Sequence, residues 1–345
     1  MRKVAVCGHF GFGKTLLNGQ TIKTKVIATE LIEKLGSDDV MTIDTHGGLL
    51  RLVCSIISSV TAMFTCWNMV ILPAHNGVRV LGPILAFFRM FSRCKLHYVV
   101  IGGWLPQLLG DKPYLARALK KFDAIYVETT IMRKRLEAMG FDNVVFMPNC
   151  KKLDILSKSE LTCYDTAPFP LCTFSRVMEE KGIEDAVDAV TQINQQYGKT
   201  IYTLDIYGQV DPGYKEHFDS LQEMWPTYIR YRGYVEFDKS VDVLKNYFAL
   251  LFPTHFFTEG IPGSIIDAYA AGVPVISAQW ESCQDIVDQT TGFCFPFDDQ
   301  RTFVQQLEMI AKDPNAVLEK KIACLARAAD YLPCNVINIL INNLK

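Results

Sequence analysis

The chain has 345 residues, of which 49% are hydrophobic and 21% charged, and its net charge is −2. This length and composition are ordinary for a globular protein of about two domains. The eleven cysteines are odd in number and include no Cys-x-x-Cys pair, which argues against a disulfide framework or a zinc site and indicates a reducing compartment. The chain runs into a predicted strand at Lys3 without a signal peptide, so we expect a cytoplasmic protein.

Charge is divided unevenly along the chain. Residues 1–150 contain 18 Lys/Arg and 10 Asp/Glu, whereas residues 151–345 contain 17 and 27, so the two net charges are +8 and −10. A basic first half favours an anionic partner, either a phosphate-bearing acceptor or the surface of an anionic membrane. Nucleic acid is not favoured, because the basic residues do not form a stripe with interleaved aromatic residues.

A glycine-rich loop follows the first predicted strand, which covers Lys3–Cys7. Gly8 to Thr15 read GHFGFGKT, which matches the Gly-x4-Gly-Lys-Thr spacing of a phosphate-binding P-loop. A P-loop continues directly into its helix, but here Asn18-Gly19 interrupts the chain, and the helical pattern begins near Thr21. The predicted strands that end at Leu72 and at Ile101 also lack an acidic residue at their ends. A P-loop NTPase or kinase therefore remains an alternative.

Two apolar segments of the first half raise the question of a membrane. Residues 52–78 carry no charged side chain, but Ser, Thr and Asn residues interrupt the segment. We therefore expect a buried helix to about Phe64 and a strand over Met69–Leu72 rather than a transmembrane helix. Leu81–Lys95 predicts a basic amphipathic helix, which would either pack on its own sheet or lie on an anionic membrane. His75 follows a strand, where a residue of a ligand-binding cleft is expected, although a lone histidine is more often structural.

Strands alternate with helices through the rest of the chain, which predicts α/β architecture with parallel, doubly wound sheets. Further strands are predicted at His97–Ile101, Asp123–Val127, Asn143–Met147, Leu171–Phe174, Thr203–Tyr207, Ile229–Val235, Ala249–Thr254, Val273–Ser277 and Thr291–Pro296. Thr130 is the predicted cap of the helix that precedes Asn143. Residues 150–168 are polar and poorly periodic, as in a linker. We therefore predict domains at 1–149 and 169–330, a linker at 150–168 and a C-terminal helix within 331–345.

The loop Ser175–Gly182 carries two cations between a predicted strand and a predicted helix. Arg176 and Lys181 are five residues apart, at the N-terminus of that helix. This arrangement suits a diphosphate and can stabilise it as a leaving group. The alternative is that the two cations form surface pairs with Glu179 and Glu180.

The stretch Thr258–Ser277 forms a loop, a helix and a strand. Gly260, Ile261 and Gly263 can present backbone N–H groups to an anion at the helix N-terminus, and ligands of open α/β sheets bind at such strand ends. Glu259 lies beside this terminus. Ser264 is the predicted helix cap and Gly272 the predicted end of the helix. Asp267, inside the helix, would bind a ribose hydroxyl or pair with Ser264 in a capping box.

These residues resemble the donor site of the family-four glycosyltransferases. The family signature is Glu-x7-Glu followed by Ala-x-x-Ala-Gly-x-Pro-Val, and Glu259 and Asp267 stand at its acidic positions, the second acid being one methylene shorter. Arg176 and Lys181 match the family's Arg-x4-Lys-Gly, and Gly208 matches a family glycine. The resemblance is specific in the second half and loose in the first. It implies the GT-B fold, with two Rossmann-like doubly wound domains facing a cleft and the last helices packed back on the first domain.

The resemblance also implies the chemistry: a hexosyltransferase that uses a UDP- or GDP-linked sugar and retains anomeric configuration. It implies no required metal or other cofactor, because the two cations replace a metal. The implied catalytic residues are Glu259, Arg176 and Lys181. The implied donor-binding residues, in the C-terminal domain, are Arg176, Lys181, Gly208, Glu259, Gly260, Ile261, Pro262, Gly263 and Asp267. The implied acceptor-side residues, in the N-terminal domain, are Gly11, Gly13, Lys14, Gly19, Gln20 and His75.

The basic first half suggests the acceptor. We expect a phosphate-bearing or lipid-linked saccharide of surface polysaccharide synthesis, with peripheral contact at the inner face of the cell membrane. Besides the P-loop enzyme, a nucleotide-sugar epimerase or a nucleotide-sugar binding protein of the same architecture stays open, because architecture alone does not decide chemistry.

Overall fold

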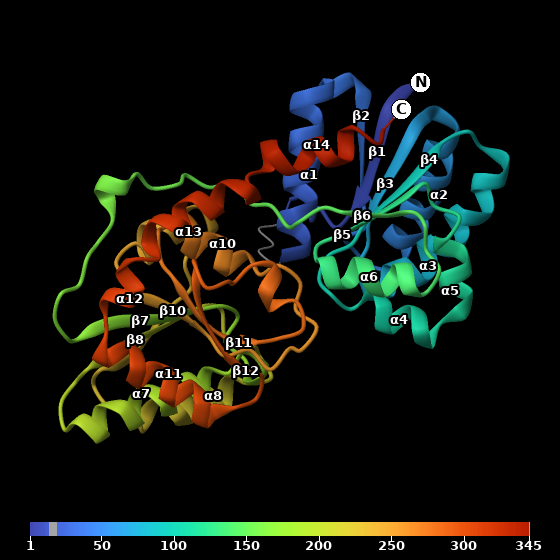
Figure 1. The fold of residues 1–345 in the computed structure, drawn as a ribbon. Helices are drawn as coiled ribbons and strands as arrows, with labels where there is room; N and C mark the ends of the chain where they lie inside the picture. Colours follow the sequence, from blue (N-terminus) through green and yellow to red (C-terminus); the bar gives the residue numbers. More distant parts are fainter. Residues whose placement is uncertain (14–18, 345) are drawn as a thin grey trace. The chain divides into compact units, whose positions relative to one another are not determined.

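Two parallel sheets of six strands each organise the chain (Figure 1). The computed structural model describes residues 1–13 and 19–344. The chain divides into unit 1, Met1–Lys152 with Tyr331–Lys345, and unit 2, Leu153–Asp330. Residues 153–168, part of the expected linker, therefore count with unit 2, and the C-terminal segment counts with unit 1.

Unit 1 has the strand order β2-β1-β3-β4-β5-β6. Its strands are β1 (Arg2–Gly8), β2 (Val40–Asp44), β3 (Cys66–Leu72), β4 (Lys95–Val99), β5 (Ala124–Val127) and β6 (Val144–Phe146). Its helices are α1 (Gly19–Leu35), α2 (Leu49–Thr65), α3 (His75–Phe88), α4 (Leu105–Asp111), α5 (Pro113–Leu119), α6 (Thr130–Ala138) and α14 (Pro333–Ile341). The order of the strands reverses between β1 and β3, so a ligand of this sheet is expected beside the ends of these two strands.

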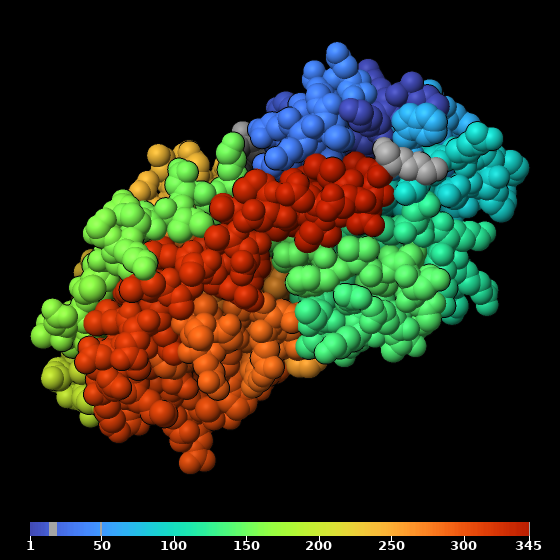
Figure 2. Space-filling model, turned by 45° about the horizontal axis from the view of Figure 1, so that its top comes forward, coloured from blue at the N-terminus to red at the C-terminus, as the bar shows by residue number. Residues whose placement is uncertain are grey.

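Buried side chains alternate between the two faces of the unit 1 sheet. In β1, Val4 and Val6 join the core with α1 and α14, whereas Ala5 and Cys7 join the core with α2 to α6. Figures 1 and 2 both show α14, in red, against the blue N-terminal part of the chain, and α14 contacts α1. The period-2 apolar pattern of the strands thus serves two cores, one on each face.

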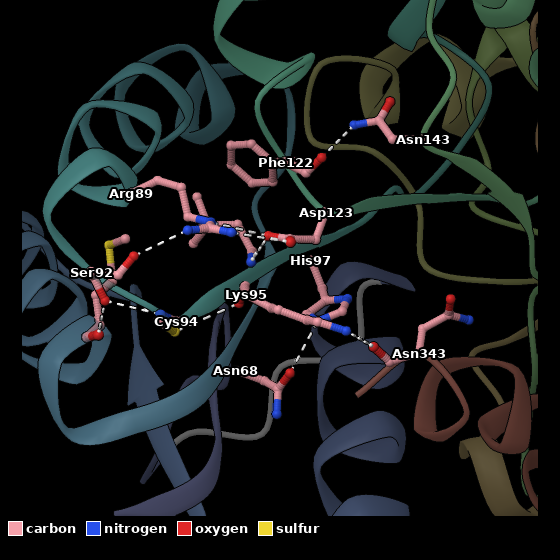
Figure 3. A network of polar contacts seen from close by, with 12 residues as sticks. Asn68, Arg89, Ser92, Cys94, Lys95, His97, Phe122, Asp123, Asn143 and Asn343 are labelled. Carbon is pink, nitrogen blue, oxygen red and sulfur yellow. Dashed lines mark hydrogen bonds and ion pairs between the residues drawn. The ribbon is translucent and has the colours of Figure 1, made fainter. Parts of the chain in front are cut away.

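A network of polar contacts holds the turn before β4 (Figure 3). The Asp123 carboxylate pairs with Arg89 at 3.2 Å and accepts a hydrogen bond from the Leu96 N–H at 2.8 Å. Ser92 Oγ donates to the Met63 carbonyl near the end of α2. The 3-10 turn Arg89–Phe91 is therefore fixed to α2 on one side and to the start of β5 on the other.

Three helices of unit 1 differ from the prediction. The predicted helix Leu81–Lys95 is instead α3 (His75–Phe88) and the turn after it, because Lys95 already pairs with β3 as the first residue of β4. Helix α2 ends at Thr65, close to the expected Phe64, but it is buried on one side only. At α6 the cap is Thr129 rather than Thr130: the Thr129 backbone is extended and its side chain accepts from the Met132 N–H.

Unit 2 has the strand order β12-β11-β10-β7-β8-β9. Its strands are β7 (Phe169–Phe174), β8 (Tyr202–Tyr207), β9 (Ile229–Gly233), β10 (Ala249–Phe252), β11 (Val275–Gln279) and β12 (Gly292–Pro296). Its helices are α7 (Ile183–Tyr197), α8 (Lys215–Glu223), α9 (Ser240–Leu244), α10 (Gly263–Ala270), α11 (Gln300–Lys312), α12 (Asn315–Leu318) and α13 (Lys321–Ala328). Here the order of the strands reverses between β7 and β10.

Helix α10 begins and ends through its backbone. Gly272 lies at φ +64°, its N–H donates to the Tyr269 carbonyl, and the Val273 N–H donates to the Ala268 carbonyl, which is a Schellman motif. The prediction that Gly272 ends the helix is confirmed. The prediction for Ser264 is wrong, because the N-cap is Pro262 and Ser264 lies inside the helix. A capping box between Ser264 and Asp267 is therefore excluded.

One stretch of the described residues, Asn315–Ile341, is long and apolar enough to cross a membrane by length and composition. The structure divides it into α12, α13, the 3-10 turn Ala329–Tyr331 and α14. Val317 packs in the core of unit 2, and Ile337 packs in the core of unit 1. Apolar side chains of this stretch are thus buried in the cores of the two units.

Helix α13 carries a lysine that is almost fully buried. Lys321 is 2% exposed, and its Nζ donates to the carbonyls of Tyr247 at 3.4 Å and Gly272 at 3.5 Å. Burial penalises the ammonium ion and lowers the pKa of Lys321 from 10.5 to about 8. This lysine therefore joins α13 to the C-terminal end of α10 at an electrostatic cost.

The buried lysine predicts a pH-dependent stability. Between pH 8 and 10.5 the unfolded chain binds more protons at Lys321 than the folded chain, so this residue makes the wild type more stable as pH rises. We expect the free energy of unfolding of wild type minus that of Lys321→Met to increase from pH 7 to pH 10, by on the order of 3 kcal/mol. Urea denaturation at both pH values measures it. Lys199→Met, at an exposed site, is the control, and equal pH dependence in both variants would contradict the assignment.

Candidate active site

The cationic and acidic motifs of unit 2 meet where the order of its strands reverses. Strands β7 and β10 are neighbours in the sheet. The loop after β7 carries Lys181, the loop after β10 carries Glu259, and Lys181 Nζ forms an ion pair with Glu259 Oε1. Folding therefore brings two of the predicted catalytic residues into direct contact at the edge where α/β sheets bind ligands.

Aromatic and polar groups position this ion pair. Lys181 Nζ lies 4.8 Å from the centre of the Phe256 ring and 5.6 Å from that of Phe252, so both rings add cation–π attraction. Thr254 Oγ1 donates to Glu259 Oε1 at 3.4 Å. The Lys181 and Glu259 side chains are 16% and 17% exposed. The pair is held in one place while part of it still faces solvent.

Glycines allow the loops of unit 2 to approach each other closely. Gly182 lies at φ +66°, and a Cβ there would stand 1.9 Å from the Pro253 carbonyl oxygen. Gly208 lies at φ +139°, and a Cβ there would stand 1.7 Å from the Ser175 carbonyl oxygen. Both positions require glycine for backbone conformation and for space. Gly208, predicted as a donor-site residue, thus packs directly behind the residue that precedes Arg176.

Arg176 is the more exposed of the two cations. Its Nη2 lies 2.8 Å from Asp211 Oδ2, and its side chain is 57% exposed. An ion pair in contact with solvent contributes little to stability, so the guanidinium can exchange Asp211 for another anion at small cost. Arg176 and Lys181 therefore pair with Asp211 and Glu259. The alternative of surface pairs with Glu179 and Glu180 is not what the structure shows.

The N-terminus of α10 adds backbone groups to the site. Gly260 and Ile261 are buried, while Pro262 and Gly263 are half-buried, and a Cβ at Gly263 would meet no atom within 4 Å. The positive end of the helix dipole points to this open space. Asp267 lies one turn further in α10 and is 2% exposed. Its carboxylate is thus an interior group of α10.

Sequence reasoning missed a histidine four residues before Glu259. His255 lies between two carboxylates, with Asp185 Oδ2 at 2.9 Å and Asp298 Oδ1 at 2.6 Å. Burial disfavours the imidazolium, but the Asp298 and Asp185 carboxylates outweigh it and raise the pKa of His255 above its ordinary value. Within the part of the chain that the structure describes, no His, Cys, Asp and Glu cluster is arranged to hold a metal ion. This trio joins the loop after β10 to the first turn of α7.

In unit 1, the loop after β1 approaches a half-buried carboxylate whose role the sequence did not reveal. Asp44 accepts backbone hydrogen bonds from Phe10, Gly11, Phe12 and His46 at 2.9 to 3.2 Å. Burial raises the pKa of this carboxyl, but the four donors outweigh burial and lower it. A P-loop uses backbone N–H groups of its glycine-rich loop to hold phosphate. Three such groups here already bind Asp44, which argues against the P-loop alternative.

The predicted acceptor-side residues lie at strand ends of unit 1. Gly11 and Gly13 have positive φ in the loop after β1, and Gly19 and Gln20 begin α1. Gln20 Nε2 donates to the carbonyl of Leu72, the last residue of β3. His75 begins α3, and its ring lies 5.4 Å from the ring of Trp104. Lys14 lies outside the described residues. The described members thus surround the point where the strand order of unit 1 reverses.

A second ion pair missed by sequence reasoning lies deep in unit 1. Lys23 Nζ pairs with Glu128 Oε1 and donates to the Val100 carbonyl at 3.2 Å, and Glu128 Oε2 accepts from the Gly102 N–H at 3.3 Å. Lys23 and Glu128 are almost fully buried. The residues are 105 positions apart, so no local pattern predicts them. The pair fixes the start of the Gly102-Gly103 loop, next to Trp104 and His75.

Comparison with known proteins identifies the second unit. Residues 169–313 match the model of the family Glycosyl transferases group 1. The chain carries a group 1 glycosyltransferase domain. Within this glycosyltransferase domain lie Arg176, Lys181, Glu259 and Asp267, the residues on which the sequence resemblance rested. No curated protein sequence matches the chain.

The similarity of this glycosyltransferase to solved structures extends over both units. HepE from Anabaena, in complex with UDP, is 12% identical with a TM-score of 0.75 and covers 99% of each chain. Sucrose-phosphate synthase from Thermosynechococcus elongatus is 14% identical with a TM-score of 0.75 and covers 99% of this chain and 98% of its own. The pneumococcal O-GlcNAc transferase GtfA, in complex with UDP and GlcNAc, is 17% identical with a TM-score of 0.65. The match covers 86% of this chain and 60% of the GtfA chain. The prediction of two Rossmann-like domains of the GT-B type is confirmed.

The close approach at Gly182 predicts a large effect of one methyl group. Gly182 and Gly198 flank α7 and share a left-handed backbone, but a Cβ at Gly198 would meet nothing within 4 Å. We expect Gly198→Ala to cost about 1 kcal/mol of unfolding free energy for its backbone alone, and Gly182→Ala about 3 kcal/mol because the Pro253 carbonyl must move as well. Urea denaturation of the two variants tests this, and equal costs would refute the packing argument.

Proposed function

We propose that this glycosyltransferase takes a sugar from a UDP-linked donor bound in unit 2 and transfers it to a phosphate-bearing saccharide acceptor. The single observation that carries the proposal is the Lys181–Glu259 ion pair beside Arg176 at the reversal of the unit 2 strand order. A nucleotide sugar needs cations for its diphosphate and a carboxylate for its hydroxyl groups. This corner of unit 2 offers both.

The diphosphate is assigned to the two cations. Arg176 can present its planar guanidinium to two phosphate oxygens at once, and Lys181 adds a second positive charge from the N-terminal side of α7. The ion pairs with Asp211 and Glu259 keep both side chains in place before the donor binds. When the diphosphate arrives, it replaces part of these carboxylate contacts, so little rearrangement is needed.

The sugar and the ribose are assigned to the α10 side of the site. Glu259 would accept hydrogen bonds from the transferred sugar, and the backbone of Gly260, Ile261, Pro262 and Gly263 would line it. The open space beside Gly263 supports this assignment. Asp267 would accept from a ribose hydroxyl. Gly208 would keep the loop of Arg176 close to β8, where a side chain would push it away.

The proposed reaction retains anomeric configuration. The bond between the anomeric carbon and the diphosphate oxygen breaks, and Arg176 and Lys181 stabilise the negative charge on the leaving diphosphate. The acceptor hydroxyl forms the new bond on the same face and passes its proton to the leaving phosphate oxygen. The two cations supply the charge that a metal supplies in other transferases, so we propose that no metal is required.

Uracil is the proposed base because HepE and GtfA were solved with UDP, as was TarM from S. aureus. The proposed acceptor rests on charge. Unit 1 contains 21 Lys/Arg and 10 Asp/Glu, a net charge of +11, and attracts an anionic substrate. A lipid-linked saccharide phosphate of surface polysaccharide synthesis, used at the inner face of the cell membrane, fits this charge. Gly11, Gly13, Lys14, Gly19, Gln20 and His75 are the residues proposed to bind it.

Binding of the donor predicts a nucleotide-specific thermal shift. UDP at about 100 times its Kd should stabilise the wild type by roughly 2.7 kcal/mol, with or without Mg²⁺. Arg176→Ala should weaken UDP binding by about 10- to 100-fold, because a charge-assisted hydrogen bond is lost. Thermal denaturation with UDP, GDP, ADP and ATP measures both effects.

Arg133→Ala is the matched control, since Arg133 is an exposed arginine in an ion pair on α6 of unit 1 and should bind UDP normally. Stabilisation by ATP with Mg²⁺ that depends on Lys14 alone would instead support a P-loop enzyme.

The acceptor proposal predicts a preference between two substrates. A lipid-linked saccharide diphosphate should be glycosylated with a kcat/KM at least about tenfold higher than the same saccharide without phosphate, because unit 1 is cationic. Release of UDP, with analysis of the anomeric proton of the product, reports rate and stereochemistry. Glu259→Gln is the inactive control, expected to lose about 100-fold in rate while still binding UDP. Equal use of the two acceptors would exclude this acceptor class, and conversion of the donor without acceptor would indicate an epimerase.

A further inference from the structure

Helix α2 leaves a row of apolar side chains exposed on unit 1. The side that packs inside the unit carries Ser55, Ser59, Ala62 and Met63, and Ile56 packs partly buried against the same core. The opposite side carries Leu50, Val53, Ile57 and Phe64, which are 47 to 82% exposed. Their spacing of three, four and seven places them on one stripe of the helix. We call these four residues the α2 stripe.

A second group of exposed apolar residues continues the α2 stripe. Phe87, Met90 and Phe91, at the end of α3 and in the turn after it, are 52 to 64% exposed. Ser92 Oγ donates to the Met63 carbonyl, so this turn adjoins the end of α2 that carries Phe64 (Figure 3). Arg89 holds the same turn to Asp123. The α2 stripe and these three residues, together the apolar surface of unit 1, are therefore presented by fixed backbone.

Exposure of so many large apolar groups on one surface needs an explanation. Single exposed apolar residues are ordinary, but a contiguous apolar patch on a protein surface marks a site of interaction. On α2 the exposed apolar residues form one stripe, whereas Ser55 and Ser59 of the same helix are buried. We infer that the apolar surface is covered in the working state of the protein.

The charges around the apolar surface indicate what covers it. Residues 45–110, which contain α2, α3 and β4, include five basic residues and no Asp or Glu. The five are Arg51, Arg79, Arg89, Arg93 and Lys95. Arg51 lies next to Leu50, and Arg93 follows the Arg89–Phe91 turn. Two copies of such a surface would repel each other, whereas an anionic lipid bilayer offers hydrocarbon and negative charge together.

We propose that unit 1 docks on an anionic lipid bilayer through the apolar surface, with Arg51 and Arg93 at the level of the headgroups. The proposal differs from the surface expected for Leu81–Lys95, because Leu81 and Leu85 are buried in the core. It concerns a face of unit 1 and not the residues proposed to bind the donor, so docking does not depend on the proposed function.

Vesicle flotation without nucleotide tests the docking. The wild type should bind vesicles of phosphatidylcholine with phosphatidylglycerol and should bind far less to phosphatidylcholine alone, and added salt should weaken binding. Ile57→Ser and Phe64→Ser should each lower the partition coefficient at least about tenfold, because each removes a large apolar side chain that would be buried in the bilayer. Met309→Ser is the matched control: Met309 is 65% exposed on α11 of unit 2 and should not contribute.

Three results would overturn the proposal: equal binding of wild type and Ile57→Ser, equal binding to neutral and anionic vesicles, or a wild-type dimer in solution that Ile57→Ser dissociates. The last result would show that a second copy covers the surface. Because UDP-induced stabilisation should be unchanged in Ile57→Ser, a failure of docking can be told apart from a failure of the proposed function.

Discussion

The ion pair between Lys181 and Glu259 depends on two strands that become neighbours only when the unit 2 sheet forms. Their loops can meet because Gly182 leaves room for the Pro253 carbonyl, a distance that no side chain would permit. The backbone therefore comes first: the sheet sets which loops are adjacent, glycine sets how closely they approach, and the charged side chains then fall into contact. Arg176 follows the same order of causes, since Gly208 sets the position of the loop that carries it.

The two units have loops of similar geometry that carry different chemical groups. Both place glycine-rich loops at the point where the strand order reverses. In unit 2 the loops present cations and a helix N-terminus, which suits a diphosphate. In unit 1 the backbone N–H groups of the first loop are already bound by Asp44, an anion of the protein itself. The N–H groups of Phe10, Gly11 and Phe12 are therefore satisfied without a bound ligand. Any anion that unit 1 attracts is thus attracted by the net positive charge of the unit rather than by these three N–H groups.

Sequence patterns were informative where the deciding interactions are local. Gly272 ends α10 because a left-handed residue is needed there, and the alternation of strands with helices predicted both sheets. The errors have long-range causes: Lys95 is drawn into β4 by pairing with β3, and the His255 trio joins residues from three separate segments. Burial of α2 was predicted from its lack of charge. Composition alone could not show which of its sides faces the core, since the polar serines pack inside.

The last helix of unit 1 comes from the far end of the chain. Val336, Ile337 and Leu340 of α14 complete the core that Val4 and Val6 of β1 begin, and all of unit 2 lies between them in sequence. During synthesis the contiguous residues of unit 2 are therefore available to fold before unit 1 has all of its parts. Until α14 emerges from the ribosome, one face of the first sheet remains partly uncovered. The order of translation thus makes unit 1, the first to be started, the last to be finished.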